Sequence, residues 1–247
     1  MTTRLLTYNI RRGGSGREAA LAAVVAACRP TIVVLQEARV AGVVERIAAA
    51  AGLPYWGARD GDSLGFMSAI PMQRAEWHRP RFSRHAFLEL EPSSLPVRVF
   101  GVHLSAVHAA WTERRRSREL RSLLASVARR SDGFHVLTGD FNTLAPGELL
   151  DVRKLPGRLK ALVWLSGGRI RWRTIQIVLD AGYTDGFRLR HPDDAGHSFP
   201  AWDPHVRLDY VFVPTTSADR LLACDIVRDG AGQPASDHFP LLAELDV

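Results

Sequence analysis

Two patterns of hydrophobic and polar positions run along the chain. Short apolar runs bounded by Gly, Pro or polar clusters predict β-strands, and apolar residues at helical spacing predict helices. The apolar runs indicate strands at residues 4–9, 31–36, 55–58, 64–68, 75–78, 86–90, 97–103, 135–140, 208–213, 221–227 and 241–246. Helical spacing indicates helices at residues 17–28, 40–51, 112–130 and 174–181. Helix–strand units therefore flank a strand-rich centre, and spacing alone predicts a mixed α/β fold.

Strands without intervening helices dominate residues 55–103. Pro71, Pro80, Pro92 and Pro96 separate these strands, and consecutive strands with short punctuated connections are typical of antiparallel hairpins. We therefore expect this stretch to form an antiparallel meander.

The helix expected at residues 112–130 has a hydrophobic stripe and a basic stripe. Its apolar positions, among them Leu120 and Leu123, recur at helical spacing, mostly opposite a cluster of arginines. A charge run opposite an apolar stripe is typical of a solvent-exposed face. We predict that the cluster is solvated rather than a binding patch; it comprises Arg114, Arg115, Arg116, Arg118 and Arg121.

The composition is that of an ordinary globular protein, with 46% hydrophobic and 23% charged residues among 247. This length fits one large domain or two small ones, and we favour a single domain, 1–247, because polar motifs near both ends must meet. No apolar run approaches the roughly 20 residues that cross a bilayer, and the strand pattern starting at Arg4 leaves no room for a secretory leader. Cys28 and Cys224 are far apart, as is typical of a reducing compartment. We expect a cytoplasmic monomer.

The formal net charge of +6 makes the chain basic. Arginine provides 30 of the 32 basic residues, because only Lys154 and Lys160 are lysines. A basic surface attracts nucleic acid, anionic lipid or phosphorylated molecules. Abundant Arg with almost no Lys can equally reflect biased base composition, so the charge alone leaves the partner open.

Polar groups directly follow several apolar runs, where strands would end. Groups at strand ends are presented on loops, where binding and catalytic residues concentrate. Carboxylates, amides and imidazoles gathered in this way suit a divalent cation and a phosphate. The pattern predicts one site assembled from the whole chain, with contributions from Asn9, Glu37, His103, Asp140, Asn142, Asp209, Asp237 and His238.

In chain order these motifs are Asn, Glu, His, Asp-x-Asn, Asp and Asp-His. The order, from Asn9 to His238, resembles the endonuclease/exonuclease/phosphatase superfamily, which includes deoxyribonuclease I, exonuclease III, neutral sphingomyelinases and inositol-polyphosphate 5-phosphatases. The resemblance implies an α/β fold, a four-layer α-β-β-α sandwich of two packed, mainly antiparallel sheets. It also implies a divalent-metal-dependent phosphoester hydrolase with its site at one end of the two sheets.

The resemblance also implies a set of metal ligands. Glu37 is the expected principal ligand, Asn9 lies beside it and orients bound water or a phosphate oxygen, and Asp237 serves the metal or orients a ligand. Mg²⁺ prefers hard oxygen ligands and keeps several waters, so one or two carboxylates suffice. We expect Mg²⁺, or Mn²⁺, as the cofactor.

The resemblance implies acid–base roles for four further residues. Asp140 positions or deprotonates the attacking water, and Asn142 donates to a non-bridging phosphate oxygen; on an extended segment both side chains would point the same way. Asp209 and His238 resemble a carboxylate–histidine pair, in which the carboxylate fixes the imidazole tautomer and raises its basicity. The sequence leaves open whether His238 or Asp140 activates the water.

His103 matches the position that deoxyribonuclease-like members use to contact phosphate or protonate the leaving oxygen. The exonuclease III branch usually has tyrosine there, so this histidine argues against a dedicated abasic-site endonuclease. Deoxyribonuclease I pairs the equivalent histidine with a glutamate from the preceding meander, and here Asp62 is a weak candidate for that partner. The other histidines match no motif and are interpreted as surface or core residues: His78, His85, His108, His135, His191, His197 and His205.

A basic insertion at about residues 147–173 separates the Asp140 motif from the last predicted helix. From Val152 to Arg173 it has seven basic and no acidic residues. Such a segment, if it contains tryptophan, can stack bases and contact phosphates, lie on an anionic membrane, or simply pack on the sandwich as a surface helix. The residues that we expect to contact substrate are Arg169, Arg171, Arg173 and Trp164.

These observations predict a phosphodiesterase that cleaves nucleic acid, either DNA or RNA. The alternative is a phospholipid or phosphoinositide hydrolase with the basic insertion on a membrane surface. A third hypothesis is a binding module without activity. That hypothesis is disfavoured because such a protein has no chemical need for Glu37, Asp140, Asp209 and His238 together.

Overall fold

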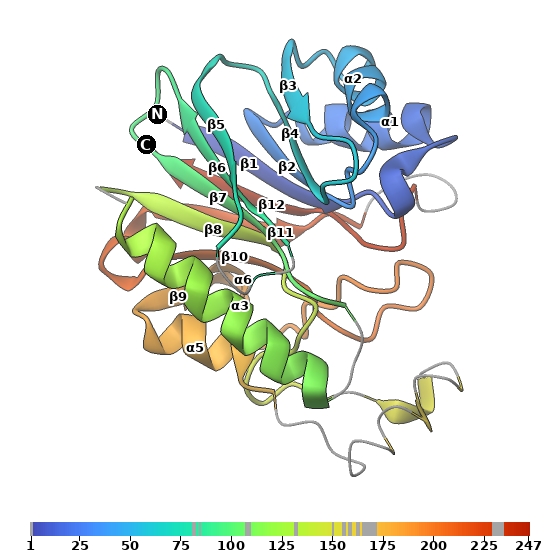
Figure 1. Ribbon diagram of the computed structural model, residues 1–247, viewed down its shortest axis with the longest axis vertical. Coiled ribbons are helices and arrows are strands. Elements are labelled where there is room, and N and C mark those ends of the chain that lie inside the picture. The colour runs from blue at the N-terminus through green and yellow to red at the C-terminus, as the bar shows by residue number, and fades with distance from the viewer. Residues whose placement is uncertain are drawn as a thin grey trace.

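The computed structural model describes residues 2–80, 83, 85–106, 110–130, 133–149, 151–154, 157, 160, 161, 164, 172–228 and 235–247. These residues contain two six-stranded sheets (Figure 1). Sheet A has the strand order β11-β12-β1-β2-β4-β3, and its neighbours are antiparallel except for β1 and β2. Its strands are β1 (Thr2–Asn9), β2 (Ile32–Gln36), β3 (Tyr55–Ala58), β4 (Leu64–Ser68), β11 (Leu221–Ile226) and β12 (Leu241–Asp246).

Sheet B repeats this plan with different strands. Its order is β5-β6-β7-β8-β10-β9. Among the described strands of this sheet, only β7 and β8 are parallel neighbours. Its strands are β5 (Met72–His78), β6 (Phe87–Pro92), β7 (Arg98–His103), β8 (His135–Asp140), β9 (Tyr183–Asp185) and β10 (Asp209–Pro214). Each sheet therefore has a parallel pair near its centre.

The two sheets pack face to face through the alternate side chains of their strands. In β2, Val34 belongs to the core between the sheets, whereas Val33 and Leu35 belong to the core on the other face. Leu88 and Val99 of sheet B join Val34 in the central core. Because both faces of the sheet are covered, β2 is apolar at consecutive positions rather than alternately apolar and polar.

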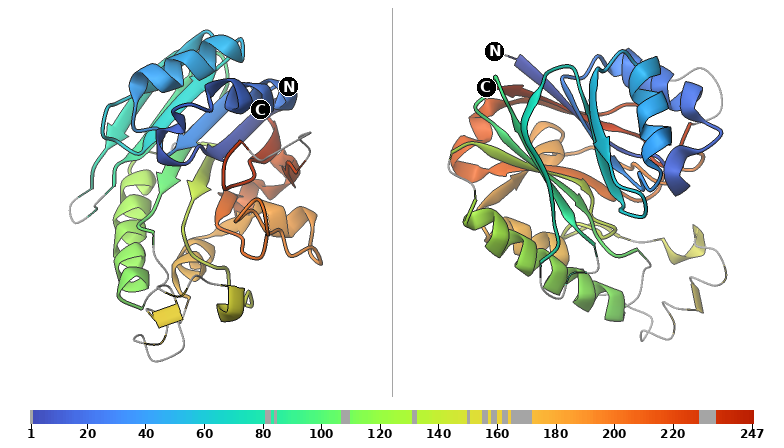
Figure 2. Two further views of the ribbon diagram at one scale, coloured as in Figure 1. Left: turned by 90° about the vertical axis from the view of Figure 1, so that its right-hand side faces the viewer. Right: turned by 45° about the horizontal axis from the view of Figure 1, so that its top comes forward.

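Helices cover the outer face of each sheet (Figure 2). On sheet A these are α1 (Glu18–Cys28) and α2 (Ala41–Ala50), and on sheet B α3 (Ala110–Ala128) and α5 (Thr174–Asp180). The predicted four-layer sandwich is thus confirmed. The short helices are η1 (Arg12–Gly14), η2 (Val152–Lys154), α6 (Gly186–Arg190) and η3 (Thr215–Arg220).

The meander expected between residues 55 and 103 is wrong as one unit, because the chain changes sheets within it. β3 and β4 belong to sheet A, whereas β5, β6 and β7 belong to sheet B. β4 already pairs with β2 on one side and β3 on the other, so it offers no free edge to β5. No pattern in the sequence predicted β9 and α6, because both elements are too short to show a periodic pattern.

The arginine cluster of α3 is only partly solvated. Arg116 is fully buried, although the other four arginines of the cluster are exposed. Arg116 lies four and seven residues before the buried Leu120 and Leu123, so it continues the hydrophobic stripe. Its guanidinium donates to Glu113 Oε2 at 3.1 Å and to the Ser105 carbonyl at 2.8 Å. A buried charge needs such partners.

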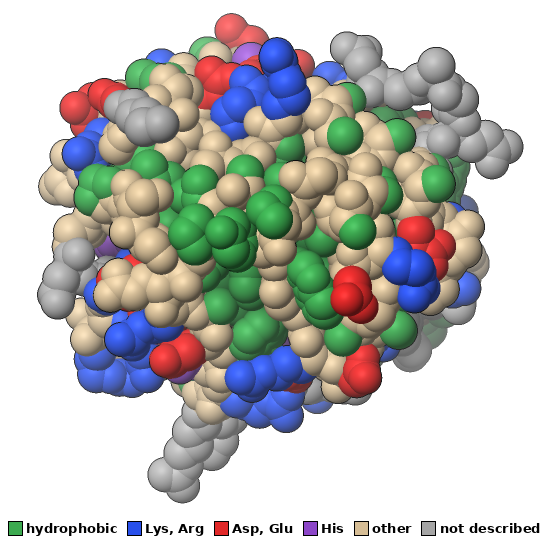
Figure 3. All heavy atoms as spheres, turned by 90° about the horizontal axis from the view of Figure 1, so that it is seen from above, with side chains coloured by type: hydrophobic (Ala, Val, Ile, Leu, Met, Phe, Trp, Pro, Cys, Tyr) green, Lys and Arg blue, Asp and Glu red, His purple; other side chains and the backbone are tan. Residues whose placement is uncertain are grey.

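The surface seen in Figure 3 carries a band of hydrophobic side chains bordered by patches of both charge signs. The positive charge of the chain therefore does not form one continuous basic surface on this face. Within the ranges that the structure describes, no helix combines the length and the apolar composition needed to cross a membrane. Cys28 and Cys224 are both free and buried.

Candidate active site

The ends of three neighbouring strands of sheet B carry one row of titratable side chains. In the register of the sheet, His103 at the end of β7 lies opposite Asp140 at the end of β8. Asp140 in turn lies opposite Asp209, where β10 begins in the antiparallel direction. Strand pairing alone thus gathers three residues that are far apart in the sequence.

Sheet A brings Asn9 and Glu37 to the same end of the sandwich. Asn9 lies opposite Gln36 in the parallel pair β1/β2, so Glu37 follows immediately beyond the strand end. The Asn9 side chain donates to Asp140 Oδ2 at 3.0 Å and links the two sheets. Glu37 is half-buried, and its Oε2 accepts from the Arg12 amide at 2.5 Å.

The segment before β12 brings Asp237 and His238 to this site. Ser236 Oγ donates to the Asn9 carbonyl at 2.6 Å, which fixes the segment against the end of β1. His238 Nδ1 lies 2.8 Å from Asp209 Oδ2, and His238 Nε2 lies 3.8 Å from Asp140 Oδ2. The expected carboxylate–histidine pair is therefore in contact.

Asp140 is the centre of the arrangement. It is 1% exposed, and its Oδ1 accepts from the Asn142 amide at 2.8 Å. Besides its contact with His238, it lies 4.0 Å from His103 Nε2. Burial raises the pKa of Asp140 to about 7, against the opposing effect of His238. A carboxylate with such a pKa can exchange a proton near neutral pH.

The two histidines of the site are perturbed in opposite directions. Burial by itself lowers the pKa of His238, but the carboxylates of Asp209 and Asp140 outweigh it and raise that pKa to about 10. Burial lowers the pKa of His103 to about 3, helped by His85, His238 and Arg39. His238 is thus held as an imidazolium and His103 as a neutral ring.

Gly139 permits the close approach of β7 and β8 beside the site. Its φ is +142°, and a Cβ there would lie 1.9 Å from the Val102 carbonyl oxygen. No side chain fits at that distance, so only glycine can precede Asp140 in this geometry. The Gly-Asp dipeptide is therefore a requirement of strand packing as well as of the site.

Four residues around the site have left-handed backbone conformations that are unusual outside glycine. They are Arg11, Arg12, Glu37 and Asn142, with φ between 49° and 57°. Such conformations cost energy, persist where the surrounding structure enforces them, and cluster at functional sites. The turn at Asn142 also shows that the Asp140–Asn142 segment is not extended as expected, and the Asn142 side chain donates to the Leu104 carbonyl at 3.0 Å.

The three expected metal ligands differ in their surroundings. The Glu37 carboxylate is accessible, Asn9 Oδ1 accepts from the Arg11 amide at 3.0 Å, and Asp237 Oδ2 lies 3.3 Å from Arg11 Nε. Carboxylate and amide oxygens suit a hard divalent cation, so the chemistry of these donors fits a divalent metal ion.

Two groups of three His, Asp or Glu side chains among the described residues bring their ligand atoms within 4.8 Å. One is Asp140, Asp209 and His238. This group is less suited to a cation, because His238 Nδ1 and Asp209 already bind each other. The His238 ring, with its raised pKa, is also held in the positively charged form. The other is Glu76, His78 and Glu89 on the β5–β6 hairpin, where Arg98 and Arg130 lie 4.0 and 3.7 Å from Glu89.

The predicted partner of His103 is wrong. Asp62 forms an ion pair with Arg79 at 2.7 Å. His85, interpreted from the sequence as an ordinary packing residue, instead has its ring stacked on that of His103. Nothing in the local sequence indicates this contact, because it joins a residue just before β6 to the end of β7.

Most of the basic insertion gives no support for substrate contacts. Arg169 and Arg171 lie outside the described residues. Trp164 is 75% exposed. Arg173 is exposed, and its backbone amide donates to Glu113 Oε1 at 2.7 Å as α5 begins. The role expected for these four residues stays a prediction.

The hairpin at residues 198–206 contributes residues that the sequence did not indicate. Ser198 Oγ donates to Asp209 Oδ2 at 2.6 Å, and the Phe199 ring lies 4.7 Å from that of His238. Trp202 is 62% exposed, with the Arg11 guanidinium 5.7 Å from its ring. The motif Arg207-Leu208-Asp209 marks the next strand but says nothing of the hairpin that precedes it.

The fold and this cluster of acid–base groups define a phosphoester hydrolase of the kind that the motif order suggested. Residues 6–238 match the Endonuclease/Exonuclease/phosphatase family, and the chain belongs to that family. Its members hydrolyse phosphoester bonds. No curated protein sequence matches the chain.

Several solved structures share the fold over almost the whole chain. The 3′ phosphatase NExo from Neisseria, bound to a product DNA hairpin, is 20% identical, with 99% of this chain and 100% of that chain covered and a TM-score of 0.74. An AP endonuclease from Archaeoglobus fulgidus is 17% identical, with the same coverage and a TM-score of 0.75. TDP2 of D. rerio, complexed with a single-strand DNA product, is 18% identical, with 100% and 99% covered and a TM-score of 0.69.

Proposed function

We propose that this chain is a divalent-metal-dependent phosphodiesterase that cleaves nucleic acid. The observation that carries the proposal is the buried Asp140, held between Asn9 and the Asn142 amide and within 4.0 Å of two histidines. Titratable groups with pKa values moved in opposite directions are characteristic of acid–base catalysis. We further infer that residues 1–247 act as one domain, since both sheets contribute to the site.

The proposed roles follow from the charge states. Asp140 takes the proton of the attacking water, because its raised pKa makes it a base at neutral pH. His238, as an imidazolium held by Asp209, binds a phosphate oxygen. His103, as a neutral ring, donates an N–H to the phosphate or the leaving oxygen. In this proposal the base is Asp140 rather than His238, a choice that the sequence left open.

Glu37, with Asn9 and Asp237 beside it, would hold the divalent cation, which neutralises phosphate charge when bound. Glu37 is the ligand that the proposal requires, because its carboxylate is accessible. Arg11 Nε lies 3.3 Å from Asp237 Oδ2, so Arg11 and the cation would share the negative charge of Asp237.

Trp202 and Arg11 favour nucleic acid among the possible phosphoesters. An exposed indole can stack on a nucleobase, and a guanidinium can contact a phosphate. The Ala201 amide donates to the Asp237 carbonyl at 2.8 Å, so the hairpin that carries Trp202 is fixed beside His238. Two neighbours in the same fold were solved with DNA products. The membrane-surface alternative rests on the exposed Trp164 and the basic insertion, and it stays a prediction.

The proposal is tested by screening purified protein with Mg²⁺ or Mn²⁺ against DNA, RNA, sphingomyelin, phosphoinositides and bis-p-nitrophenyl phosphate. We expect cleavage of the small diester and of DNA or RNA. Trp202→Ala should weaken nucleic-acid cleavage, since stacking contributes about 1–3 kcal/mol per base, and should leave the small diester nearly unchanged. Trp111→Ala, an exposed tryptophan on α3, is the matched control. Absence of diester cleavage with either metal would contradict the proposal.

A further inference from the structure

Within the part of the chain that the structure describes, no carboxylate accepts a hydrogen bond from His103 Nδ1, the nitrogen that would orient a catalytic imidazole. The ring is 5% exposed, and its Nδ1 has no hydrogen-bond partner among the described residues. Glu89, a carboxylate of the preceding hairpin, lies 2.6 Å from His78. Histidines in functional sites usually have one nitrogen fixed by a hydrogen bond that sets the tautomer and the ring orientation. Among the described residues, no hydrogen bond at Nδ1 fixes this ring.

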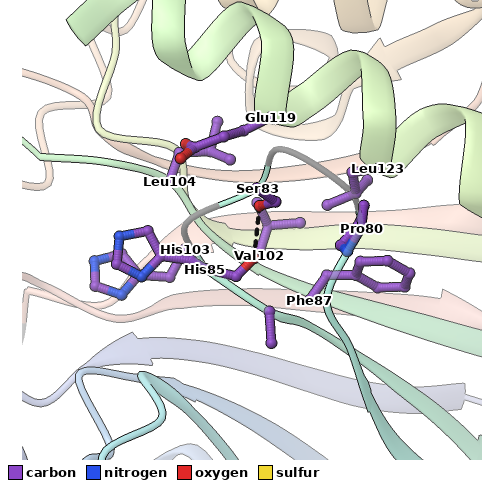
Figure 4. Close-up of a pocket in the computed structure, with 10 residues that line it drawn as sticks. Pro80, Ser83, His85, Phe87, Val102, His103, Leu104, Glu119 and Leu123 are labelled. Carbon is purple, nitrogen blue, oxygen red and sulfur yellow. Dashed lines mark hydrogen bonds between the residues drawn. The ribbon is translucent and has the colours of Figure 1, made fainter.

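The ring of His85 lies on the ring of His103. The two centroids are 5.5 Å apart and the planes differ by 25°. Figure 4 shows both rings side by side, projecting in the same direction from neighbouring segments. Both line one small cavity together with Leu104 and Glu119.

The backbone around His85 supports this arrangement. Ser83 Oγ donates to the His85 carbonyl at 2.6 Å. The bond links two residues that lie just before β6, which begins at Phe87. The side chain that meets His103 thus comes from a position directly before a sheet strand.

We propose that His85 is a positioning residue that holds the His103 ring by stacking against its face. The proposal rests on the proposed function, in which His103 contacts the phosphate or the leaving oxygen. A stacked imidazole fixes the plane of the ring without adding negative charge. It therefore leaves His103 neutral, in agreement with the low pKa of His103, which arises mainly from burial and then from His85.

The consequence is specific to this geometry. A carboxylate would orient His103 and would also favour its protonated form. His85 orients His103 without favouring that form. His103 then acts as a hydrogen-bond donor rather than as a cationic acid. Any flat ring at position 85 should serve, because the proposed contact is between ring faces.

The kinetic test compares His85→Ala with His85→Phe on a small soluble diester. Aromatic pairs contribute about 0.5–1.5 kcal/mol, so we expect His85→Ala to lower kcat about 2- to 12-fold with KM nearly unchanged. His85→Phe should restore most of this loss. In a His103→Ala background, His85→Ala should add nothing further. His191→Ala is the control, because His191 lies 4.7 Å from the Phe187 ring, and His191 has no part in the site.

Two kinetic results would overturn the proposal. One is a His85→Phe variant as impaired as His85→Ala, which would mean that the nitrogen atoms of His85 are needed. The other is losses for His85→Ala and His103→Ala that multiply in the double variant, which would mean that the two residues act independently.

A measurement without substrate separates this proposal from the proposed function. The ¹⁵N and ¹³C signals of the His103 ring report how well ordered the ring is and what surrounds it. We expect one set of narrow ring signals in the unmodified protein and in His85→Phe, and broadened or shifted signals in His85→Ala, where the ring is no longer held. Unchanged His103 signals in His85→Ala would overturn the proposal even in a fully active enzyme. Absence of diester cleavage would count against the proposed function while leaving this spectroscopic result interpretable.

Discussion

At the site, sheet A and sheet B each contribute the ends of a parallel strand pair, β1 with β2 and β7 with β8. The end of sheet B carries Asp140 and His103 as buried groups in register. The end of sheet A carries the accessible Glu37, on a residue with a left-handed backbone. The same strand plan therefore supports two environments: a buried one that alters pKa values and an open one that suits a hydrated cation.

This difference follows from what covers each strand end. At the sheet B end, β10 lies beside β8 and brings Asp209 against Asp140, while His238 approaches both. At the sheet A end, only the Arg12 amide, among the residues that the structure describes, donates to the Glu37 carboxylate. We therefore propose acid–base chemistry at the sheet B end and metal binding at the sheet A end.

The largest expected effect is at the sheet B end. Asp209→Asn and His238→Ala should each lower kcat by about 10²- to 10⁴-fold, the usual contribution of an acid–base group. The double variant should lose little more than the worse single variant, because both changes break one hydrogen-bonded unit. Asp225→Asn is the control, since Asp225 lies 2.8 Å from His191 in an exposed pair. Single losses that multiply in the double variant would show that the two residues act separately.

The sheet A end should respond to metal concentration rather than to pH. Glu37→Gln keeps an oxygen ligand but not its charge, so we expect activity at low Mg²⁺ to fall by about 10- to 100-fold or more, a range seen even for groups that only orient ligands. Raising Mg²⁺ should recover part of the loss. Glu45→Gln, on the exposed side of α2, should behave like the unmodified protein. Normal turnover of Glu37→Gln at low Mg²⁺ would remove Glu37 from the metal site.

The residues at strand ends were predictable from the sequence, and their neighbours were not. An apolar run that stops at Asn9 or Asp140 shows both the strand and the polar group at its end, so the pattern contains that part of the site. Ser198 and His85 act through contacts between segments that meet only after the sheets have packed. No local spacing indicates such contacts.

Arg116 shows a similar limit within the fold. Its position on the hydrophobic stripe was visible, but five arginines in one helix predicted a solvated face. The buried acceptor that makes its burial possible is Glu113 on the same helix, and both belong to a polar network that also reaches residues of distant loops. Burial of a charge depends on partners that a periodic pattern does not specify.

The smallest expected effect concerns this network beneath the sheet B end. Glu113 accepts from the amides of Arg173 and Thr174 at 2.7 Å and from Thr143 Oγ1 at 2.8 Å. Burial alone raises the pKa of Glu113, but Arg116 and these hydrogen bonds outweigh it and lower that pKa below its ordinary 4.5. As pH falls, Glu113 is therefore protonated in the unfolded chain before it is protonated in the folded protein. Its contribution to stability is complete at pH values above its pKa in the unfolded chain, and it is lost as pH falls through its pKa in the folded protein.

Glu113→Gln should therefore reduce the free energy of unfolding by about 1–3 kcal/mol at pH 7, where buried donors lose a charged acceptor. The difference from the unmodified protein should shrink as pH falls below 4.5, because protonation removes the same charge from the native glutamate. Urea unfolding between pH 7 and pH 3 measures both effects, with Glu45→Gln as the exposed control. If the difference in unfolding free energy between Glu113→Gln and the unmodified protein stays constant over this range, Glu113 acts only through its shape. The network with Thr143 and Thr174 would then not depend on a buried carboxylate.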